Sequence, residues 1–434
     1  MAVDRSTDAR LGPIELLRVA PQFRRLWYAQ IVSELGDWFQ IVALLTLLPT
    51  ASGNSWVVAG YLVLRLVPSI VLAPFVGVIA DRFDRGKVLI ACDVLRAVVV
   101  LLYPFVVRAD GSANIVLLYA LSFTQESLSA LWEPARGAVI PQVVPARGLL
   151  SANVLSGATW SAMLALGAFL GGATTRRLGR DAAYVIDAAT FLFSAVLTVA
   201  ARLPRLPPST HDHAAHGPPP GAIREGVAYL RSHPAQATTA CLKGGWGLVA
   251  GGIAVLFTAF SDQVFTHHDA LAAAGAIGVL YAGRGLGALI GPFIARRMTG
   301  ETVAGLTRAV LLSFPAAAIG YFGYAFAPTL RLAAIALIVA HAGGSTIWVH
   351  SSQLLQLTVP NRLLGRVIAV EFALLTSAMC ASIMVTSALL DVARWNPRTA
   401  AAALASVPLV VTLAWALVRP RVRAKLEADA ETLG

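Results

Sequence analysis

The chain has 434 residues, of which 57% are hydrophobic and only 13% are charged, and its formal net charge is +11. Ordinary soluble domains carry about 25% charged residues. The chain therefore lacks the charged side chains that would cover two or three water-soluble domains of this total length. This composition excludes an ordinary soluble protein and indicates a chain whose surface is covered by lipid.

Long apolar runs follow one another along the sequence. A helix needs about 20 apolar residues to cross the hydrocarbon core of a bilayer, and long runs that do not alternate in polarity favour helices over strands. We expect twelve spans, at residues 26–49, 55–80, 86–107, 113–134, 149–173, 182–201, 237–261, 272–295, 303–326, 331–353, 364–389 and 398–418.

Between the sixth and seventh expected spans lies a polar, Pro-rich stretch, LPRLPPSTHDHAAHGPPPGA. Such composition is typical of a disordered linker. We therefore expect an N-terminal six-helix bundle at 1–205, a cytoplasmic linker at 206–222 and a C-terminal six-helix bundle at 223–434. The linker's three histidines favour a chance cluster over a metal site. IREGVAYLRSHP, which follows it, predicts a short amphipathic helix on the cytoplasmic surface. The predicted fold class is an all-α membrane protein of twelve transmembrane helices in two bundles.

The positive charges predict the orientation of these spans. Lys and Arg gather on the cytoplasmic side of membrane proteins, and twelve spans place both termini on one side. Most of the 34 Lys and Arg residues fall on that side. We therefore expect a multi-pass protein of the plasma (inner) membrane with both termini in the cytoplasm. Because the charges are scattered over short loops, a nucleic-acid-binding surface is disfavoured.

A short charged stretch, GVIADRFDRGK, separates the second and third expected spans. Its basic residues would hold the turn in the cytoplasm, but acidic residues contribute little to orientation, so the aspartates need another explanation. The stretch resembles the loop signature of the major facilitator superfamily, roughly G-x-x-x-D-R-x-G-R-[RK], with Asp84 in place of the central glycine. The matching residues are Gly77, Asp81, Arg82, Arg85 and Lys87.

Other stretches resemble one branch of that superfamily, the drug:proton antiporters that include enterobactin-type siderophore exporters and macrolide efflux proteins. FRRLWYAQIVSELGDW resembles the first span of this branch, and EPARGAVIPQVVPARGLLSAN resembles its loop between spans four and five. QLLQLTVPNRLLGRV resembles its loop between spans ten and eleven. LGAFLGG departs from the antiporter motif G-P-x-x-G-G, because Ala168 replaces the proline.

The resemblance implies a transport mechanism by alternating access, in which two bundles rock around a central site. It also implies that the charged loop is a latch of the outward-open state. The alternative is a solvated turn without a latch. The residues expected to form the latch are Gly77, Asp81, Arg82, Arg85 and Glu133, with Glu133 as an acidic partner of the arginines.

Ionisable residues within a bilayer are costly unless they are paired or face water, so each is a functional candidate. Glu34 and Asp37 lie three residues apart, on one helical face. Asp37 and Arg65 lie at similar depths in the first two spans and are expected to form a buried pair, with either a structural or a transport role.

Glu126 lies in the fourth span, two helical turns from Glu133, without a basic partner within one turn of its own span. A carboxyl group in such a place could exchange protons near neutral pH. We therefore expect Asp37 and Glu126 to couple transport to protons, with Glu34 and His341 as further candidates. A lone buried histidine is more often a packing residue, so His341 keeps both interpretations.

The other ionisable residues of the spans are candidates for buried pairs or for a substrate site. Asp93 and Arg96 are three residues apart, which favours a local ion pair. Arg284 is flanked by glycines, which permit close helix packing or leave room for an anionic ligand. Glu371 lies in the eleventh span.

No nucleotide-binding loop and no catalytic constellation is recognisable in the sequence, which predicts a protein that is not an enzyme and uses no cofactor or metal. We expect an exporter of a small amphipathic molecule, such as a drug, siderophore or secondary metabolite, working by proton antiport. The alternatives are an uncoupled facilitator or lipid flippase, and a membrane sensor that transports nothing. The expected partners are a small-molecule substrate, protons and the lipid bilayer, with no nucleic acid, and we expect a monomer.

Overall fold

The computed structural model describes residues 11–72, 83–106, 113–204 and 222–433. These residues form helices joined by short turns, and the described ranges contain no β-strand element. The predicted latch residues Gly77, Asp81 and Arg82, and the Pro-rich linker with its histidines, lie outside them.

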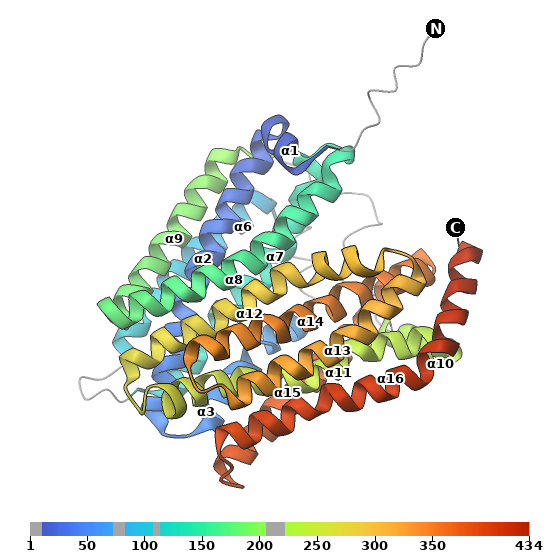
Figure 1. Cartoon of the computed structure of the whole chain (residues 1–434). Coiled ribbons are helices and arrows are strands. Elements are labelled where there is room, and N and C mark those ends of the chain that lie inside the picture. The colour runs from blue at the N-terminus through green and yellow to red at the C-terminus, as the bar shows by residue number, and fades with distance from the viewer. Residues whose placement is uncertain (1–10, 73–82, 107–112, 205–221, 434) are drawn as a thin grey trace. The chain divides into compact units, whose positions relative to one another are not determined.

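The helices follow one another closely along the chain (Figure 1). Those of the N-terminal half are α1 (Pro13–Val19), α2 (Pro21–Ser52), α3 (Ser55–Leu64), α4 (Val67–Val71), α6 (Arg85–Leu101), η2 (Tyr103–Val106), α7 (Ile115–Val143), η3 (Ala146–Gly148), α8 (Leu149–Leu178) and α9 (Arg180–Ala201). Those of the C-terminal half are α10 (Ala222–Ser232), α11 (Pro234–Ala259), η4 (Phe260–Phe265), α12 (Ala270–Thr299), α13 (Val303–Phe326), α14 (Leu330–Thr358), α15 (Asn361–Asp391) and α16 (Pro397–Leu433).

Eleven helices of the described ranges are long and apolar enough to cross a membrane. They match eleven of the twelve expected spans. The described part of the remaining span, the second, holds the shorter apolar stretch Ser55–Val71, which comprises α3 and α4. The predicted all-α membrane fold is confirmed. The amphipathic helix expected after the linker is present as α10.

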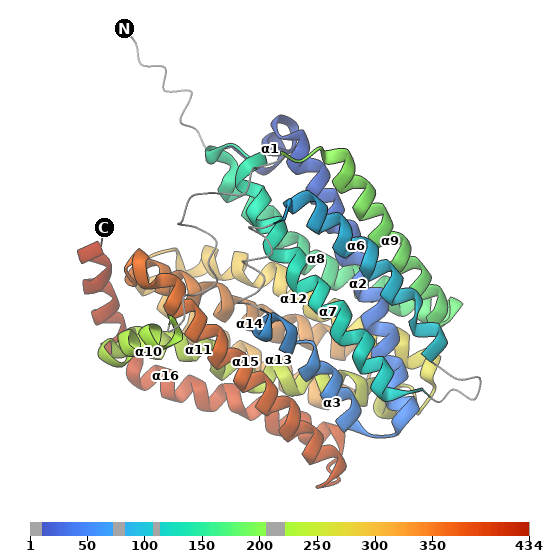
Figure 2. The same cartoon turned by 180° about the vertical axis from the view of Figure 1, so that it is seen from behind.

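The chain divides into two compact units, the first formed by residues 1–44 and 64–217. In this unit α6 packs against α7 and α9, and α8 packs against α9 (Figure 2). One hydrophobic cluster of this unit joins α1, α2, α6, α7 and α8 through buried side chains that include Leu16, Phe23, Leu89, Trp132 and Ala152.

The second unit comprises residues 45–63 and 218–434. In this unit α14 packs against α12 and α13, while α11 packs against α15 and α16. Its core includes Phe314, Ile347 and Trp415. Segment 45–63 joins this unit through α15, where the Trp56 N–H donates to Asp391 Oδ2 at 3.1 Å.

Several helices begin at a side chain that caps the free backbone N–H groups of the first turn. Asp84, which replaces the glycine of the loop signature, is the N-cap of α6 and accepts a hydrogen bond from the Lys87 N–H at 2.9 Å. Asn114 caps α7 in the same way, at 3.1 Å from the Leu117 nitrogen. The departure at Asp84 therefore has a local structural reason.

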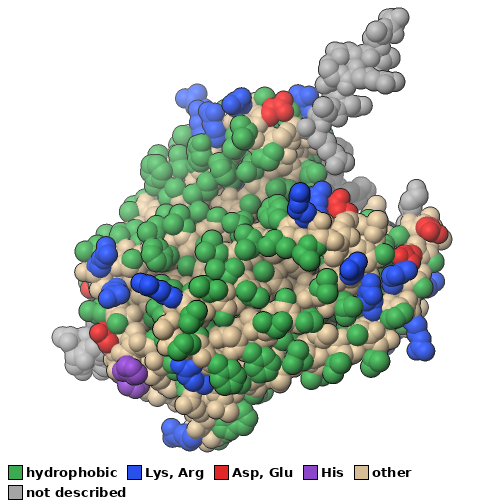
Figure 3. Space-filling view, in the orientation of Figure 1, with side chains coloured by type: hydrophobic (Ala, Val, Ile, Leu, Met, Phe, Trp, Pro, Cys, Tyr) green, Lys and Arg blue, Asp and Glu red, His purple; other side chains and the backbone are tan. Residues whose placement is uncertain are grey.

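Large hydrophobic side chains remain exposed along the helices. Phe105 is 85% exposed, Leu417 is 80% exposed and Val116 is 78% exposed. On the face shown in Figure 3, hydrophobic side chains cover much of the surface while Lys and Arg gather near the helix ends. Extended apolar surface of this kind is rare on soluble proteins and fits helices surrounded by lipid.

Candidate functional site

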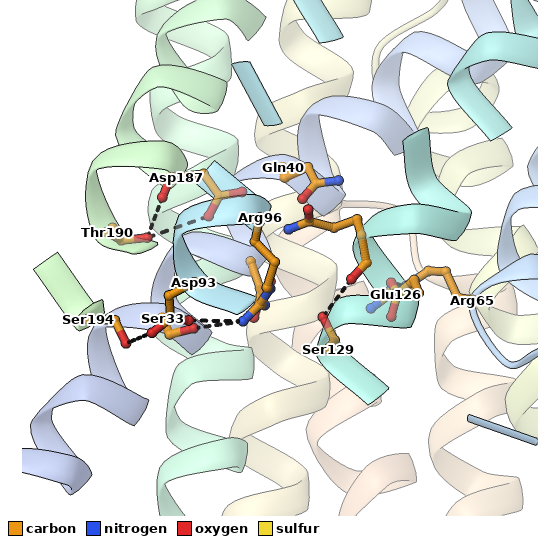
Figure 4. A network of polar contacts seen from close by, with 12 residues as sticks. Ser33, Gln40, Arg65, Asp93, Arg96, Glu126, Ser129, Asp187, Thr190 and Ser194 are labelled. Atoms are coloured by element: carbon orange, nitrogen blue, oxygen red, sulfur yellow. Dashed lines mark hydrogen bonds and ion pairs between the residues drawn. The ribbon is translucent and has the colours of Figure 1, made fainter. Parts of the chain in front are cut away.

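A cluster of buried charged side chains centres on Arg96 of α6 (Figure 4). The Arg96 side chain is 3% exposed, and its Nη2 lies 2.6 Å from Asp37 Oδ1 of α2. Nη1 donates to Ser33 Oγ at 3.2 Å and lies 3.6 Å from Asp93 Oδ1. The guanidinium also covers the Phe191 ring, with 4.0 Å between its central carbon and the ring centroid. The local pair expected from Asp93 and Arg96 is therefore present, and Arg96 has a second carboxylate partner.

Helix α9 adds a third carboxyl group to this cluster. Asp187 is fully buried, and it lies within electrostatic range of Asp37 and Arg96. The Thr190 hydroxyl contacts Asp187 Oδ1 at 3.5 Å, whereas Asp187 Oδ2 has no hydrogen-bond partner among the described residues. Gly36 makes this approach possible, since a Cβ at that position would lie 2.5 Å from Asp187 Oδ1.

Asp93 is equally buried but better satisfied than Asp187. Its Oδ2 accepts a hydrogen bond from the Ser194 hydroxyl of α9 at 2.7 Å. By contrast, the Asp37 side chain is 28% exposed. The cluster thus contains two carboxyl groups without access to solvent, one with partial access, and a single guanidinium. We call Asp37, Asp93, Arg96 and Asp187 the acidic cluster.

The expected pair between Asp37 and Arg65 is wrong. Arg65 Nε lies 2.6 Å from Glu126 Oε1 of α7, and both side chains are about a quarter exposed, 27% for Arg65 and 22% for Glu126. Glu126 was expected to have no basic partner within its own span, and the partner that the structure gives it, Arg65, comes from a different span. The prediction rested on the similar depths of Asp37 and Arg65 in the membrane. The structure instead directs Asp37 toward α6 and Arg65 toward α7.

Glu34 belongs to a second polar group at the centre of the first unit. Its Oε1 accepts from the Gln30 amide at 2.7 Å, and Gln30 Oε1 accepts from Arg136 Nη1 at 2.8 Å. Arg136 Nη2 in turn lies 3.2 Å from Glu133 Oε2. Glu133 was expected to be a partner of the loop arginines. In the described residues its ion pair is with Arg136, while Arg85 donates to the Ala138 carbonyl at 3.1 Å.

The second unit contains its own buried ion pair. Lys243 Nζ of α11 lies 2.9 Å from Glu371 Oε2 of α15 and donates to Ser352 Oγ at 2.6 Å. The side chains of Lys243 and Glu371 are 1% and 0% exposed. The Lys243 ammonium also lies over two aromatic rings, 4.8 Å from the centroid of Trp348 and 5.0 Å from that of Phe372. Glu371 was expected either in a buried pair or at a substrate site, and the structure places it in a buried pair with Lys243.

Arg284 and His341, the remaining candidates, also lie in the second unit. Arg284 is half-buried in α12, and His341 is 3% exposed in α14. No group of three or more His, Cys, Asp or Glu side chains in the described ranges is arranged to hold a metal ion.

Sequence reasoning gave no role to two residues that the structure places at the centre of these networks. Asp187 and Lys243 were visible as charged residues within apolar runs, which was the only available signal. Their partners come from distant parts of the chain, since Asp187 approaches Gly36 of α2 and Lys243 pairs with Glu371 of α15.

Many membrane-length helices with charged groups buried among them define a multi-pass membrane protein with polar groups in its interior. The chain belongs to the Major Facilitator Superfamily, whose family model matches residues 26–383. The resemblance seen in the loop signature is thereby confirmed.

Two similar proteins carry the names of exporters. "Putative bacilysin exporter BacE" of Bacillus subtilis (strain 168) is 26% identical, over 84% of this chain and 87% of BacE. The enterobactin exporter EntS of Shigella boydii serotype 4 (strain Sb227) is 25% identical, over 82% of each chain. These relatives agree with the exporter branch that the sequence resembles.

Solved structures show the same fold at low sequence identity. The nucleoside transporter NupG aligns with a TM-score of 0.70 at 12% identity, over 91% of this chain and 98% of NupG. A bacterial homologue of the human lysosomal transporter Spinster aligns with a TM-score of 0.64 at 15% identity, over 95% of this chain and 98% of the homologue. These structures show the fold, while the family match and the two exporter relatives identify the protein as a membrane transporter of small molecules.

Proposed function

We propose that the protein exports a small amphipathic molecule in exchange for protons, by alternating access, and that the acidic cluster carries the proton. The names of BacE and EntS support export as the direction of transport. The proton-coupling role rests on one observation, which is that three carboxyl groups share one guanidinium in a largely buried site.

The charge balance of the cluster favours a bound proton. If Asp37, Asp93 and Asp187 were all ionised, Arg96 would leave two negative charges without compensation. Burying an uncompensated charge costs several kcal/mol, and a proton removes that cost. Asp37 holds Arg96 at 2.6 Å. One oxygen of Asp93 accepts from Ser194 and the other lies 3.6 Å from Arg96, whereas Asp187 Oδ2 has no donor among the described residues. Asp187 is therefore the proposed site of the proton.

The cluster also offers a route by which a proton could be exchanged. Asp37 contacts Arg96 and is partly exposed, while Asp187 is not exposed. A change in the surroundings of Asp37 would alter its hold on Arg96. Arg96 would then be free to compensate Asp187, and the proton would be released. If the cargo binds one of these two states more tightly than the other, the difference in its binding free energy couples cargo binding to proton release.

The pair of Arg65 and Glu126 has a smaller part in this proposal. Glu126 has its own cation at 2.6 Å, so its charge is compensated whether or not Arg96 moves. Glu34 and His341 likewise remain secondary candidates, because within the described residues neither forms an ion pair with a member of the acidic cluster.

The test compares two aspartates of one helix in proteoliposomes with a pH-sensitive dye inside. Asp187→Asn replaces the buried group, and Asp181→Asn changes an exposed aspartate in the first turn of α9. The substrates are a cationic probe, ethidium, and the related pair dansylglycine and dansylglycinamide. The wild type and Asp181→Asn should accumulate at least one probe against its gradient when a pH difference is imposed.

Asp187→Asn should lose this uphill accumulation but still equilibrate the probe, since the neutral amide resembles the protonated acid. Uphill accumulation by Asp187→Asn at the wild-type rate would remove Asp187 from the proposal. Equilibration by the wild type that is indifferent to pH would indicate an uncoupled facilitator. Failure of the wild type to move any probe would favour a sensor.

A further inference from the structure

Arg284 lies among the apolar helices of the second unit, where it is half-buried. In the described ranges, no carboxylate lies within 4.0 Å of its guanidinium. The contact that Arg284 makes is with the Tyr281 ring, 5.7 Å from the centroid to the central carbon of the guanidinium. Lys243, in the same unit, has Glu371 at 2.9 Å. A charged group within a membrane protein that lacks a counter-ion is costly, so Arg284 needs an explanation.

Two buried polar groups near Arg284 also lack partners. His341 Nε2 and the Tyr321 hydroxyl have no hydrogen-bond partner in the part of the chain that the structure describes, although the two residues are 3% and 0% exposed. Both lie within electrostatic range of Arg284. The His341 and Tyr321 rings contact each other edge to face, 5.7 Å apart. Buried polar groups are nearly always hydrogen-bonded, so two such groups beside an uncompensated cation suggest a missing ligand.

The packing of α12 against α14 holds these groups together. A Cβ at Gly283 would lie 2.6 Å from the Ala334 carbonyl oxygen, and one at Gly287 would lie 2.3 Å from that of Ile338. Only glycine fits at so close an approach of two backbones. Arg284 follows Gly283 and His341 lies three residues beyond Ile338, so this register places the two residues about six positions, or ~9 Å, apart along the helix pair. A long arginine side chain can span part of that separation, and Arg284 lies within electrostatic range of His341.

Aromatic rings line the same region of the second unit. Phe257 of α11 contacts Tyr281 edge to face at 4.9 Å and lies 6.5 Å from the His341 ring. The Trp246 indole lies beside the Tyr321 hydroxyl without hydrogen-bond geometry. The region therefore combines apolar rings with groups that can donate hydrogen bonds.

We propose that Arg284, His341 Nε2 and the Tyr321 hydroxyl bind the carboxylate of an amphipathic cargo, whose apolar part contacts the neighbouring aromatic rings. The inference rests on the proposed export function and adds the chemical class of the cargo. A guanidinium presents paired N–H donors that match a carboxylate, and an imidazole and a phenol can each donate one more hydrogen bond. A cationic cargo would be repelled by Arg284.

The experiment measures binding to the full-length protein in phosphatidylcholine nanodiscs, by energy transfer from tryptophan to a dansyl group. Dansylglycine carries a carboxylate, and dansylglycinamide is its neutral counterpart. Arg284→Gln should weaken saturable binding of dansylglycine about tenfold or more, which is the scale of a lost charged hydrogen bond. Binding of dansylglycinamide should change less than about twofold. Tyr321→Phe should weaken dansylglycine binding by a smaller factor.

The control is Arg331→Gln, which removes an exposed arginine at the start of α14 in the same unit. It should leave the affinity for both probes unchanged. Equal loss of both probes in Arg284→Gln would show damage to the fold and overturn the proposal. The proposal would also be overturned if Arg284→Gln bound dansylglycine with the wild-type affinity. The same holds if the wild type showed no saturable binding of dansylglycine.

Two further arms separate the alternatives. If added phosphatidylglycerol displaces dansylglycine, the anion at Arg284 is a lipid phosphate and the cargo assignment is overturned. The binding experiment uses no pH gradient. The preference for dansylglycine over dansylglycinamide can therefore be absent while proton-driven transport remains intact. Conversely, Asp187→Asn can lose uphill transport while the preference for dansylglycine persists.

Discussion

Gly36 shows how one missing side chain positions the acids of the first unit. A Cβ at this position would lie 1.9 Å from Thr190 Oγ1 and 2.5 Å from Asp187 Oδ1. Real carbon and oxygen atoms do not approach so closely, so α2 and α9 can meet here only at a glycine. The neighbouring Asp37 pairs with Arg96 of a third helix, α6, at 2.6 Å.

Gly36→Ala should lower the thermal unfolding midpoint of the purified protein. The added methyl group overpacks the contact between α2 and α9, which costs about 1–3 kcal/mol. Thr190→Ala in the same chain removes the nearest atom and should recover part of the loss. Gly157→Ala in α8, where no atom lies within 4 Å of the new Cβ, is the matched control. An unchanged midpoint in Gly36→Ala would contradict the close approach.

At the residue scale, the sequence predicted which charged side chains lie inside the spans. It predicted less well which of these side chains form pairs. Hydropathy places Asp37, Arg65 and Glu126 inside spans, because a charge within an apolar run is visible directly. Pairing depends on which helices are neighbours and how each is rotated, and neither is encoded locally. The structure therefore pairs Asp37 with Arg96 and Arg65 with Glu126, although depth alone favoured Asp37 with Arg65.

At the scale of elements, apolar runs located the helices but not their ends. The fourth expected span closes at residue 134, yet α7 continues through Pro134 and Pro141 to Val143. The added turns contain Arg136 and Pro141, which interrupt the sequence pattern, but Val139, Ile140 and Val143 of these turns pack in the hydrophobic core of the first unit. In the second expected span, by contrast, the first helix ends before the apolar run does. There α3 ends at Leu64 and α4 begins at Val67, next to Pro68, whose ring nitrogen cannot donate a helical hydrogen bond.

The contact between α12 and α14 gives a prediction at this scale. Gly287→Ala would place a methyl group 2.3 Å from the Ile338 carbonyl oxygen, and backbone atoms cannot yield as a flexible side chain can. The helices should separate, and the unfolding midpoint should fall by the equivalent of about 1–3 kcal/mol. Because Arg284 and His341 are held by this contact, affinity for dansylglycine should fall as well.

Gly365→Ala in α15 is the control for this variant, since nothing lies within 4 Å of its new Cβ. It should match the wild type in both measurements. If Gly287→Ala kept the wild-type midpoint and affinity, the glycines would not be what holds Arg284 beside His341.

At the scale of the whole molecule, composition carries the most information. With only 13% charged residues, the chain can cover its surface only with lipid. The family match over residues 26–383 confirms the class that follows from this argument. Orientation in the membrane rests on a separate signal, the distribution of Lys and Arg, and it stays a prediction.

Fusions on either side of α9 test that orientation. Gly179 lies in the turn between α8 and α9, and Ser232 ends α10. Our topology places Gly179 outside the cytoplasm, although Arg176, Arg177 and Arg180 surround it, because the basic residues of the other loops outweigh these three. Alkaline phosphatase, which needs disulfides formed outside the cytoplasm, should be active when fused after Gly179 and inactive after Ser232. A fluorescent protein that folds only in the cytoplasm should give the reverse pattern. Phosphatase activity after Ser232, with none after Gly179, would invert the topology and place both termini outside.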